Sequence, residues 1–311
     1  MTKPSAQGAD IVIIRWSPRA AGARASLALL AALTALAAPG PASAAAAAPA
    51  QREPGTIRTI VLDPGHGGEE VGAVGHSGLL EKDLSLDIVK RLRDRLTRHL
   101  NLNVILTRED DRVVPLRQRT AVANHAKADL FMSVHMNSSR RLSAHGTEAY
   151  FLALTASDEE AMSLAHAENL APASKPAAAA NAPAGGGGLA APEPGPSGQS
   201  ELDLVLWEMA QSEHIVSSSR LAEVVQDEMN RLLKVESRGV KQAPFSVLMG
   251  ATMPAVLVEV AFLSNESEEK MLATDEFKDK VADALESAIA RFKDQNERAL
   301  SAVPTNDGKA P

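Results

Sequence analysis

The sequence predicts a three-layer α/β fold, in which a central, mostly parallel or mixed sheet is flanked by helices and interrupted by a helical insertion. From Arg58 onward, short apolar runs of strand type alternate with longer stretches whose apolar residues recur one helical turn apart. The chain has 311 residues, of which 45% are hydrophobic and only 3% aromatic. This is enough for one large domain or two small ones, with an aliphatic core.

The N-terminal 44 residues have the pattern of a secretory signal peptide. Basic residues precede an apolar stretch over 25–38, which is followed by the small residues Ala42, Ser43 and Ala44. The stretch is shorter than the roughly 20 residues that span a bilayer, so an uncleaved anchor is the less favoured alternative. We therefore expect export across the inner membrane, a mature chain that starts near Ala45 without a transmembrane segment, and a flexible leader over 45–56.

The main domain is expected over 57–295, and its elements follow in order. The first strand covers 60–66, and the helix after it is indicated by Leu84, Ile88 and Leu92 at helical spacing. A strand over 103–107 precedes a helix that opens at Pro115. Two more strands follow, over 129–135 and 146–154.

The second half is interrupted by the insertion, which we place at 157–233. Residues 171–200 are nearly all Ala, Pro, Gly and Ser, a composition that predicts a disordered linker. Residues 201–233 show helical spacing and predict one or two helices with an acidic face. A strand over 255–259 and a helix over 265–293 complete the domain, and 296–311 is expected to be a polar tail.

Three apolar runs, far apart in the chain, each end in a residue that can bind a metal: His66, His135 and Glu259. Polar residues at strand ends project into the crevice where α/β proteins bind ligands, so we expect these three side chains to converge. Glu81, at the start of the first helix, adds a second carboxylate, although an acidic residue there can also simply stabilise the helix N-terminus. Two His, one Glu ligand and one spare Glu are the inventory of a hydrolytic zinc site.

Composition excludes several other functions. The chain has no cysteine, so disulfides, thiolate zinc ligands and a lipid-modified cysteine are ruled out. The 32 basic and 39 acidic residues give a net charge of −7, which is not the footprint of a nucleic-acid binder. The glycines near His66 lack the Gly-Lys-Ser/Thr ending of a phosphate loop.

Eight blocks, in order from about Ile57 to about Lys293, carry a specific resemblance. They include Asp63-Pro64-Gly65-His66-Gly67-Gly68, Leu130-Phe131-Met132-Ser133-Val134-His135-Met136-Asn137, Arg238-Gly239-Val240-Lys241-Gln242 and Pro254-Ala255-Val256-Leu257-Val258-Glu259. In these blocks the chain resembles the zinc-dependent N-acetylmuramoyl-L-alanine amidases that act in bacterial cell separation. The insertion interrupts the resemblance.

The resemblance implies that His66, Glu81 and His135 bind Zn²⁺ and that Glu259 is the catalytic carboxylate. It also implies a periplasmic enzyme, at the division site, that cleaves the amide bond between N-acetylmuramic acid and L-alanine in peptidoglycan. The residue chemistry agrees, because two imidazoles and one carboxylate leave zinc an open position for a water whose pKa falls to roughly 7. A carboxylate that binds no metal can then carry the proton.

The same resemblance implies that the insertion is regulatory. In divisome-activated members a helix covers the cleft and gives a Glu to the zinc until an activator, here expected to be of the LytM-like type, displaces it. The candidates in this chain are Glu213 and Glu208, with a slight preference for Glu213. An ordinary acidic helix face is the alternative interpretation of both.

Two other functions stay open from the sequence. One is a zinc peptidase or deacetylase that acts on another cell-wall bond, and the other is a non-catalytic peptidoglycan-binding module. Several residues also have two interpretations. Arg108, Arg117 and Arg119 either contact acidic muropeptide groups or form a solvated, ion-paired helix face, and the loop residues His76 and His145 are candidates to line the cleft.

Overall fold

The computed structural model describes residues 56–170 and 201–301, without the side chains of 201–213 and 300–301. The expected signal peptide, the leader up to residue 55 and the linker over 171–200 lie outside the described residues, as does the tail from 302. No helix within the described ranges is long and apolar enough to cross a membrane.

A six-stranded mixed sheet forms the centre of the domain, with the strand order β2-β1-β3-β6-β4-β5. The strands are β1 (Thr59–Pro64), β2 (Asn103–Leu106), β3 (Leu130–Asn137), β4 (Thr147–Leu152), β5 (Ser237–Ala243) and β6 (Ala255–Phe262). β2, β1, β3 and β6 are parallel to one another, whereas β4 pairs antiparallel to β6 and parallel to β5. The predicted fold class is confirmed.

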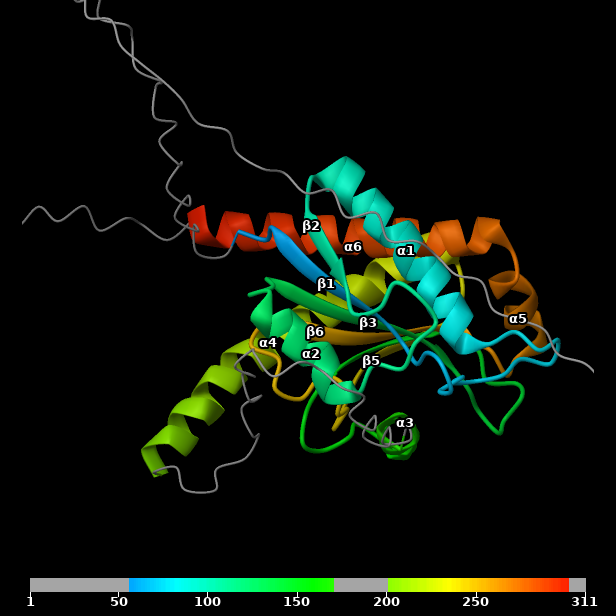
Figure 1. Cartoon of the computed structure of the whole chain (residues 1–311), viewed down its shortest axis with the longest axis horizontal. Coiled ribbons are helices and arrows are strands. Elements are labelled where there is room, and N and C mark those ends of the chain that lie inside the picture. The colour runs from blue at the N-terminus through cyan, green and yellow to red at the C-terminus, as the bar shows by residue number, and fades with distance from the viewer. Residues whose placement is uncertain (1–55, 171–200, 302–311) are drawn as a thin grey trace, which may run out of the picture. The chain divides into compact units, whose positions relative to one another are not determined.

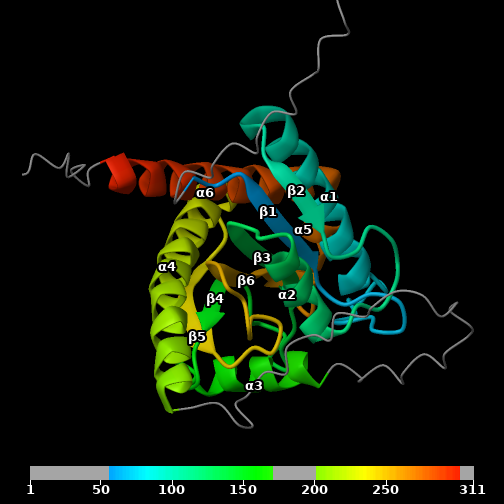
Figure 2. The same ribbon diagram turned by 60° about the vertical axis from the view of Figure 1, so that its left-hand side comes forward.

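Helices cover both faces of this sheet (Figures 1 and 2). The larger core joins one face to α1 (Glu81–Leu100), α4 (Glu201–Leu233) and α6 (Asp275–Ser301). The smaller core joins the other face to α2 (Leu116–His125) and α3 (Glu159–Asn169), through Phe131, Tyr150 and Leu257 from the strands. α5 (Glu266–Leu272) is a short helix directly after β6.

Neighbouring strand residues point to opposite faces, and this alternation decides which residues reach the site. Val134 and Val258 are fully buried in the larger core, while His135 and Glu259 face the other way, toward the layer that contains α3. The described part of α4 packs into the larger core through Leu221 and other apolar side chains. Most of the aliphatic core therefore lies on the face opposite the candidate site.

The elements differ from the sequence prediction in four places. β5 and α3 were not predicted, the expected last helix is divided into α5 and α6, and α6 continues to Ser301, past the expected end of the domain at 295. The division has a local cause, because the side chain of Asn265 caps α5 by accepting hydrogen bonds from the backbone N–H groups of Ser267 and Glu268. Residues 201–233, expected as one or two helices, form one.

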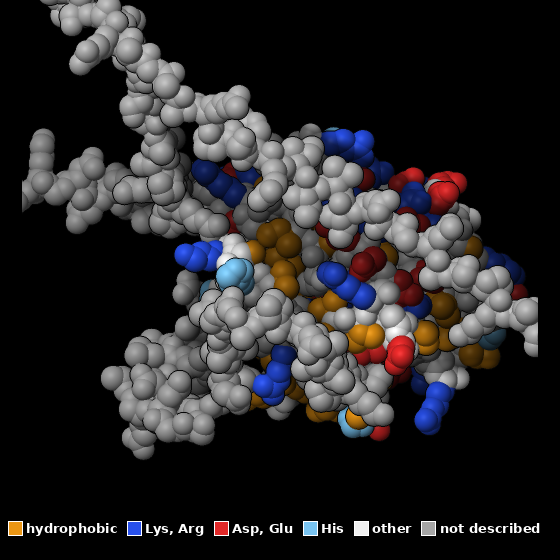
Figure 3. Space-filling view, viewed as in Figure 1, with side chains coloured by type: hydrophobic (Ala, Val, Ile, Leu, Met, Phe, Trp, Pro, Cys, Tyr) orange, Lys and Arg blue, Asp and Glu red, His pale blue; other side chains and the backbone are white. Residues whose placement is uncertain are grey.

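Charged side chains are mixed on the described surface. In the view of Figure 3, acidic and basic residues lie interspersed over the described part of that face, without a large patch of one sign. Part of this mixing comes from ion pairs between α1 and α6, such as Arg91 with Asp275 and Asp279.

Candidate metal centre and neighbouring carboxylates

The ends of three parallel strands bring the predicted residues together. β1, β3 and β6 lie side by side in the same direction, with Asp63 paired to Ser133 and His135 paired to Glu259. His66 follows β1 by two residues, and Glu81 is the first residue of α1. The convergence expected from the strand-end pattern is therefore present.

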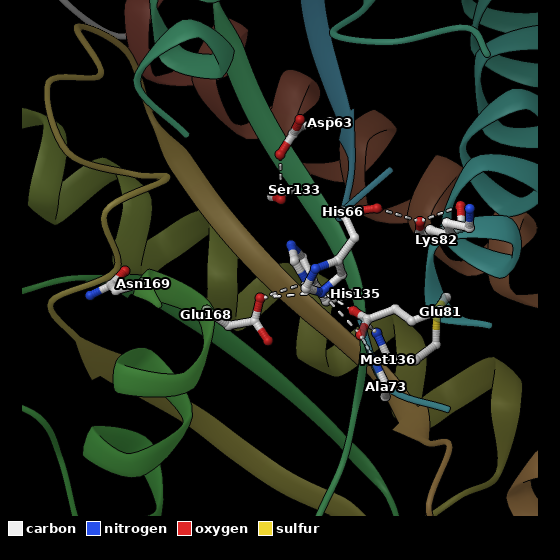
Figure 4. Close-up of polar contacts among 12 residues, drawn as sticks. Asp63, His66, Ala73, Glu81, Lys82, Ser133, His135, Met136, Glu168 and Asn169 are labelled. Carbon is white, nitrogen blue, oxygen red and sulfur yellow. Dashed lines mark hydrogen bonds and ion pairs between the residues drawn. The ribbon is translucent and has the colours of Figure 1, made fainter. Parts of the chain in front are cut away.

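The four ligand atoms of His66, Glu81, His135 and Glu168 all lie within 4.8 Å of one another and can hold a metal ion. His66 Nε2 is 3.1 Å from Glu81 Oε2 and 3.4 Å from Glu168 Oε2. His135 Nδ1 is 2.9 Å from Glu81 Oε1 and 3.3 Å from Glu168 Oε2. Figure 4 shows these side chains pointing toward one another.

These separations fit a tetrahedral cation site. Metal–ligand bonds of about 2.0–2.1 Å place neighbouring ligand atoms of a tetrahedron about 3.3 Å apart. His66 Nε2 is buried and has no hydrogen-bond partner, although two carboxylate oxygens lie close to it. A buried ring nitrogen without a hydrogen bond, among carboxylates, is better explained by a ligand to a cation than by a packing role.

The electrostatics of the cluster also favour a cation. Burial by itself would lower the pKa of His66, but the charge of Glu81 and then that of Glu168 raise it to about 9. Burial would raise the pKa of Glu81, but His66 and His135 hold it well below its usual range. The carboxylates therefore create a strongly negative potential at the ring nitrogens.

Backbone groups fix the orientation of Glu81. Its Oε2 accepts a hydrogen bond of 2.8 Å from the N–H of Ala73, and its Oε1 accepts one of 3.1 Å from the N–H of Met136. Gly72, at φ +69°, permits this approach, since a Cβ there would collide with Glu81 and with the ring of His66. The carboxylate is held in place by the protein alone.

His66 has a backbone conformation that non-glycine residues rarely adopt, with φ +57°. Two buried arginines hold the loop around it. Arg119 donates to the carbonyl oxygens of Pro64 and His66, at 2.8 and 3.0 Å, and to Asp63 Oδ1 at 2.8 Å. Arg108 donates to the carbonyl oxygens of Pro64 and Gly65, at 3.1 and 2.7 Å. The strained conformation is thus fixed from outside the cluster.

This role decides between the two interpretations of the arginines. Arg108 and Arg119 are fully buried, so they form neither a solvated helix face nor a muropeptide contact. Arg117 is exposed. Of the two loop histidines, His76 lies near the carbonyl oxygen of Ser264 and His145 pairs with Glu236. Neither is among the residues that line the cleft next to the cluster, which is described below.

Glu259 is a carboxylate without a hydrogen-bond partner. It is completely buried, and neither of its oxygens has a partner in the described structure. Its pKa is raised well above the ordinary value, first by burial and then by the charges of Glu81, Glu168 and Glu148. It stands directly across from His135 in the sheet. A buried carboxyl group with a shifted pKa beside a group that can hold a metal is a candidate for proton transfer.

Glu168, near the end of α3, is the residue that the sequence analysis missed. Burial raises the pKa of its carboxyl group, which lies against both histidines. α3 is held at its start by the N-cap of Asp158 and along its length by the buried Ala161 and Ala165. At its end, the side chain of Asn169 donates to the Pro244 carbonyl oxygen and accepts from the Ser246 N–H.

A cleft of about 430 Å³ adjoins the cluster. It is lined by His66, Glu81 and residues 69–73 on one side, and by Leu164, Ala167, Glu168 and Leu170 of the α3 region on the other. α3 therefore forms one wall of this cleft, and Glu168 reaches from this wall to the ring nitrogens. The side chains of Glu208 and Glu213, the expected blocking residues, lie outside the described residues.

The fold and the cluster define an α/β domain with a His/Glu group that can hold a metal ion. Residues 60–291 match the family model described as N-acetylmuramoyl-L-alanine amidase, and the chain belongs to this family, Amidase_3. The chain is 35% identical over 245 residues to the amidase AmiC of Neisseria meningitidis, covering 78% of this chain and 55% of AmiC. It is 32% identical over 245 residues to AmiA of Escherichia coli, covering 78% of this chain and 79% of AmiA.

The structural comparison agrees. The catalytic domain of CwlV, an amidase from Bacillus (Paenibacillus) polymyxa, has a TM-score of 0.54 at 27% identity, covering 76% of this chain and 99% of that domain. The chain spans about half the length of the AmiC relatives from N. meningitidis and E. coli, at 55% and 52%.

Proposed function

We propose that the chain is a zinc-dependent peptidoglycan hydrolase that cleaves the amide bond between N-acetylmuramic acid and the L-alanine of the stem peptide. The observation that carries this proposal is the cluster of His66, Glu81 and His135 beside the buried, partnerless Glu259, in a chain of the amidase family. The names of the relatives support the choice of bond.

In this proposal His66, Glu81 and His135 hold the zinc ion. Their two imidazoles and one carboxylate are a donor set that zinc accepts in catalytic sites. When bound, zinc would supply a water of lowered pKa and polarise the scissile carbonyl. The backbone N–H groups of Ala73 and Met136 keep the Glu81 carboxylate oriented toward both rings.

Glu259 carries the proton. As the water attacks the carbonyl carbon, a Glu259 oxygen accepts a proton from it, and the same carboxyl group then donates that proton to the leaving amine nitrogen. Its raised pKa suits this exchange, because a carboxyl group that holds its proton more tightly than usual is a better base. The products are a free lactyl carboxylate and a peptide that begins with L-alanine.

We further propose that, in the conformation of this structure, Glu168 closes the metal site to the attacking water. Its Oε2 lies 3.4 Å from His66 Nε2 and 3.3 Å from His135 Nδ1, which is the place that the attacking water would need. An activator, expected to be of the LytM-like type, would turn the enzyme on by displacing α3. Secretion to the periplasm and action at the division site belong to the same proposal and are supported by the N-terminal sequence pattern and the resemblance.

Product analysis tests the proposed reaction. Zinc-loaded Glu168→Ala protein is incubated with purified peptidoglycan, and the released fragments are identified by mass spectrometry. Free lactyl ends together with peptides that begin with L-alanine are expected, and adding Glu259→Ala should abolish them. Shortened stem peptides would indicate a peptidase, free acetate a deacetylase, and binding without products a non-catalytic module; each of these outcomes contradicts the amidase.

A further inference from the structure

A row of polar side chains crosses the sheet from the metal cluster to the edge strand. His135 on β3 is paired with Glu259 on β6, and Glu259 is paired with Glu148 on β4. Residues that are paired directly across a sheet point to the same face, so these three side chains share the face that α3 covers. Arg238 and Lys241 on the edge strand β5 continue the row.

Glu148 is fully occupied by partners. Its Oε2 accepts hydrogen bonds of 2.7 Å from Asn137 and from Tyr150. Its Oε1 accepts from Arg238 Nε at 2.7 Å and lies 3.0 Å from Lys241 Nζ. Glu148 supplies one negative charge against two positive charges, and so it neutralises only one of the two cations.

The start of α3 supplies two more carboxylates, Glu160 and the N-cap residue Asp158, which more than balance the second positive charge. Arg238 Nη2 donates to Glu160 Oε2 at 2.7 Å, and Lys241 Nζ lies 3.2 Å from Asp158 Oδ2. Arg238 is also held over the ring of Phe262, 5.2 Å from its centroid, so its free edge has a fixed direction. Without α3, the pair would present an ordered cationic site with a net charge of one on the same face as Glu259.

α3 carries carboxylates to both ends of this row. Glu160 and Glu168 are eight residues apart, about 12 Å along a helix. The row from His135 to β5 crosses three strand spacings of about 4.8 Å each, or about 14 Å. The helix therefore fits the distance between the metal cluster and the cation pair, and it places an acidic group on each.

We propose that Arg238 and Lys241 form a carboxylate-binding subsite for the acidic stem peptide, which Asp158 and Glu160 of α3 occupy in the closed state. This inference rests on the proposed function. α3 then acts as a substrate mimic with two contacts, one at the metal cluster and one at the subsite. The ligand group is a free carboxylate about four extended residues from the scissile amide, given about 3.5 Å per residue.

Kinetics with paired substrates test the subsite in a triple variant, Glu168→Ala with Asp158→Asn and Glu160→Gln. In this protein the cluster is open and no α3 carboxylate holds Arg238 or Lys241, while Asn can still cap the helix. The substrates are soluble muropeptides with free stem carboxylates and the same muropeptides with those carboxylates converted to amides. The amidated substrate lacks the charged group that accepts hydrogen bonds from Arg238 and Lys241. We therefore expect kcat/KM to be about tenfold or more higher for the free-carboxylate substrate, mainly because its KM is lower. Equal kcat/KM values for both substrates would overturn the proposed subsite and would leave the assignment of the metal cluster unaffected.

Variants locate the effect. Arg238→Gln and Lys241→Gln, each added to the triple variant, should raise KM for the free-carboxylate substrate and leave KM for the amidated one within about twofold. Arg141→Gln is the matched control, because Arg141 also lies near Glu160, at 3.8 Å, but is exposed and does not contact Glu148. It should keep the preference, and loss of preference in this control alone would overturn the assignment.

The two proposals fail differently in this experiment. If neither the Glu168→Ala protein nor the triple variant hydrolyses either muropeptide, the proposed function is wrong, and the subsite with it. If the triple variant hydrolyses both at the same rate, the amidase stands and the subsite is wrong.

Discussion

Arg119 shows how a single side chain far from the chemistry can set the geometry of the cluster. Its guanidinium group donates to the carbonyl oxygens of Val114, Pro64 and His66 and to Asp63. A planar fork with donors in several directions can satisfy all four acceptors, and an ammonium group on a flexible stem cannot. The left-handed backbone of His66 is held by this contact, because Arg119 Nη2 donates to its carbonyl oxygen.

We predict that Arg119→Lys destabilises the fold by about 2–3 kcal/mol and weakens zinc binding, since buried acceptors lose their donors. Urea unfolding and zinc competition titrations measure the two effects. Arg117→Lys, two residues earlier on the exposed side of α2, is the control and should stay within about 0.5 kcal/mol. Unchanged zinc affinity in a folded Arg119→Lys protein would contradict the positioning role.

Glu259 gives a second prediction at the residue scale, on stability. Its pKa is raised in the folded state, so the folded protein prefers the protonated carboxyl group. Below the ordinary pKa of Glu, the group is protonated in both states and has no effect. As pH rises above that value, the unfolded state releases its proton more readily, and the folded state loses stability.

Glu259→Gln should therefore stabilise the metal-free protein by about 1–2 kcal/mol at pH 7.5, with a difference that shrinks toward pH 4. Thermal or urea unfolding in the presence of a chelator, at both pH values, measures this difference. A variant that is less stable than the wild type at pH 7.5 would indicate that Glu259 has a structural partner.

At the scale of elements, α3 is the part of the domain that is best suited to move. Its buried contacts are made by the small side chains Ala161 and Ala165, the partly buried Leu164 adds one larger apolar contact, and the other contacts named above are polar. Small apolar contacts contribute little free energy of burial, so α3 can leave the sheet at a modest cost. α4, by contrast, packs Leu221, Val225 and Met229 into the larger core on the opposite face.

We predict that Ala165→Leu raises basal hydrolysis of purified peptidoglycan by about tenfold. The larger side chain overpacks the contact between α3 and the sheet, which destabilises the closed position of α3 by about 1–3 kcal/mol and shifts the helix away from the cluster. Ser163→Leu places the same side chain on the exposed face of α3 and serves as the control. It should leave the basal rate unchanged. Equal rates for both variants would argue that α3 does not limit access.

At the scale of the whole molecule, the sequence predicted those features that follow from local patterns, namely the strand ends that meet at the site and the start of the first helix. The apolar runs that end in His66, His135 and Glu259 are parallel neighbours in the sheet, so their convergence follows from the strand pattern. Glu81 also lies where the first-helix pattern placed it. These positions depend on periodicity and on strand direction, both of which are visible in a sequence.

Other features depend on contacts that no local pattern reveals. The apolar face of α3 is short and built mostly from alanine, around Ala161, Leu164 and Ala165. The contacts of Glu168 with His66 and His135 join distant parts of the chain. β5 contains Arg238, Gly239 and Lys241, so its sequence lacks the apolar alternation of a strand. The burial of Arg108 and Arg119 was equally hidden, because arginine is mostly exposed unless it is paired.

The closure of the cluster by Glu168 is tested by one measurement: the rate of peptidoglycan hydrolysis by zinc-loaded wild-type and Glu168→Ala proteins, without any partner protein. In the proposed closed state Glu168 occupies the place of the attacking water, so we predict the same products from both proteins and a rate at least about tenfold higher for Glu168→Ala. A Glu168→Ala rate equal to or below that of the wild type, at equal zinc content, would contradict it.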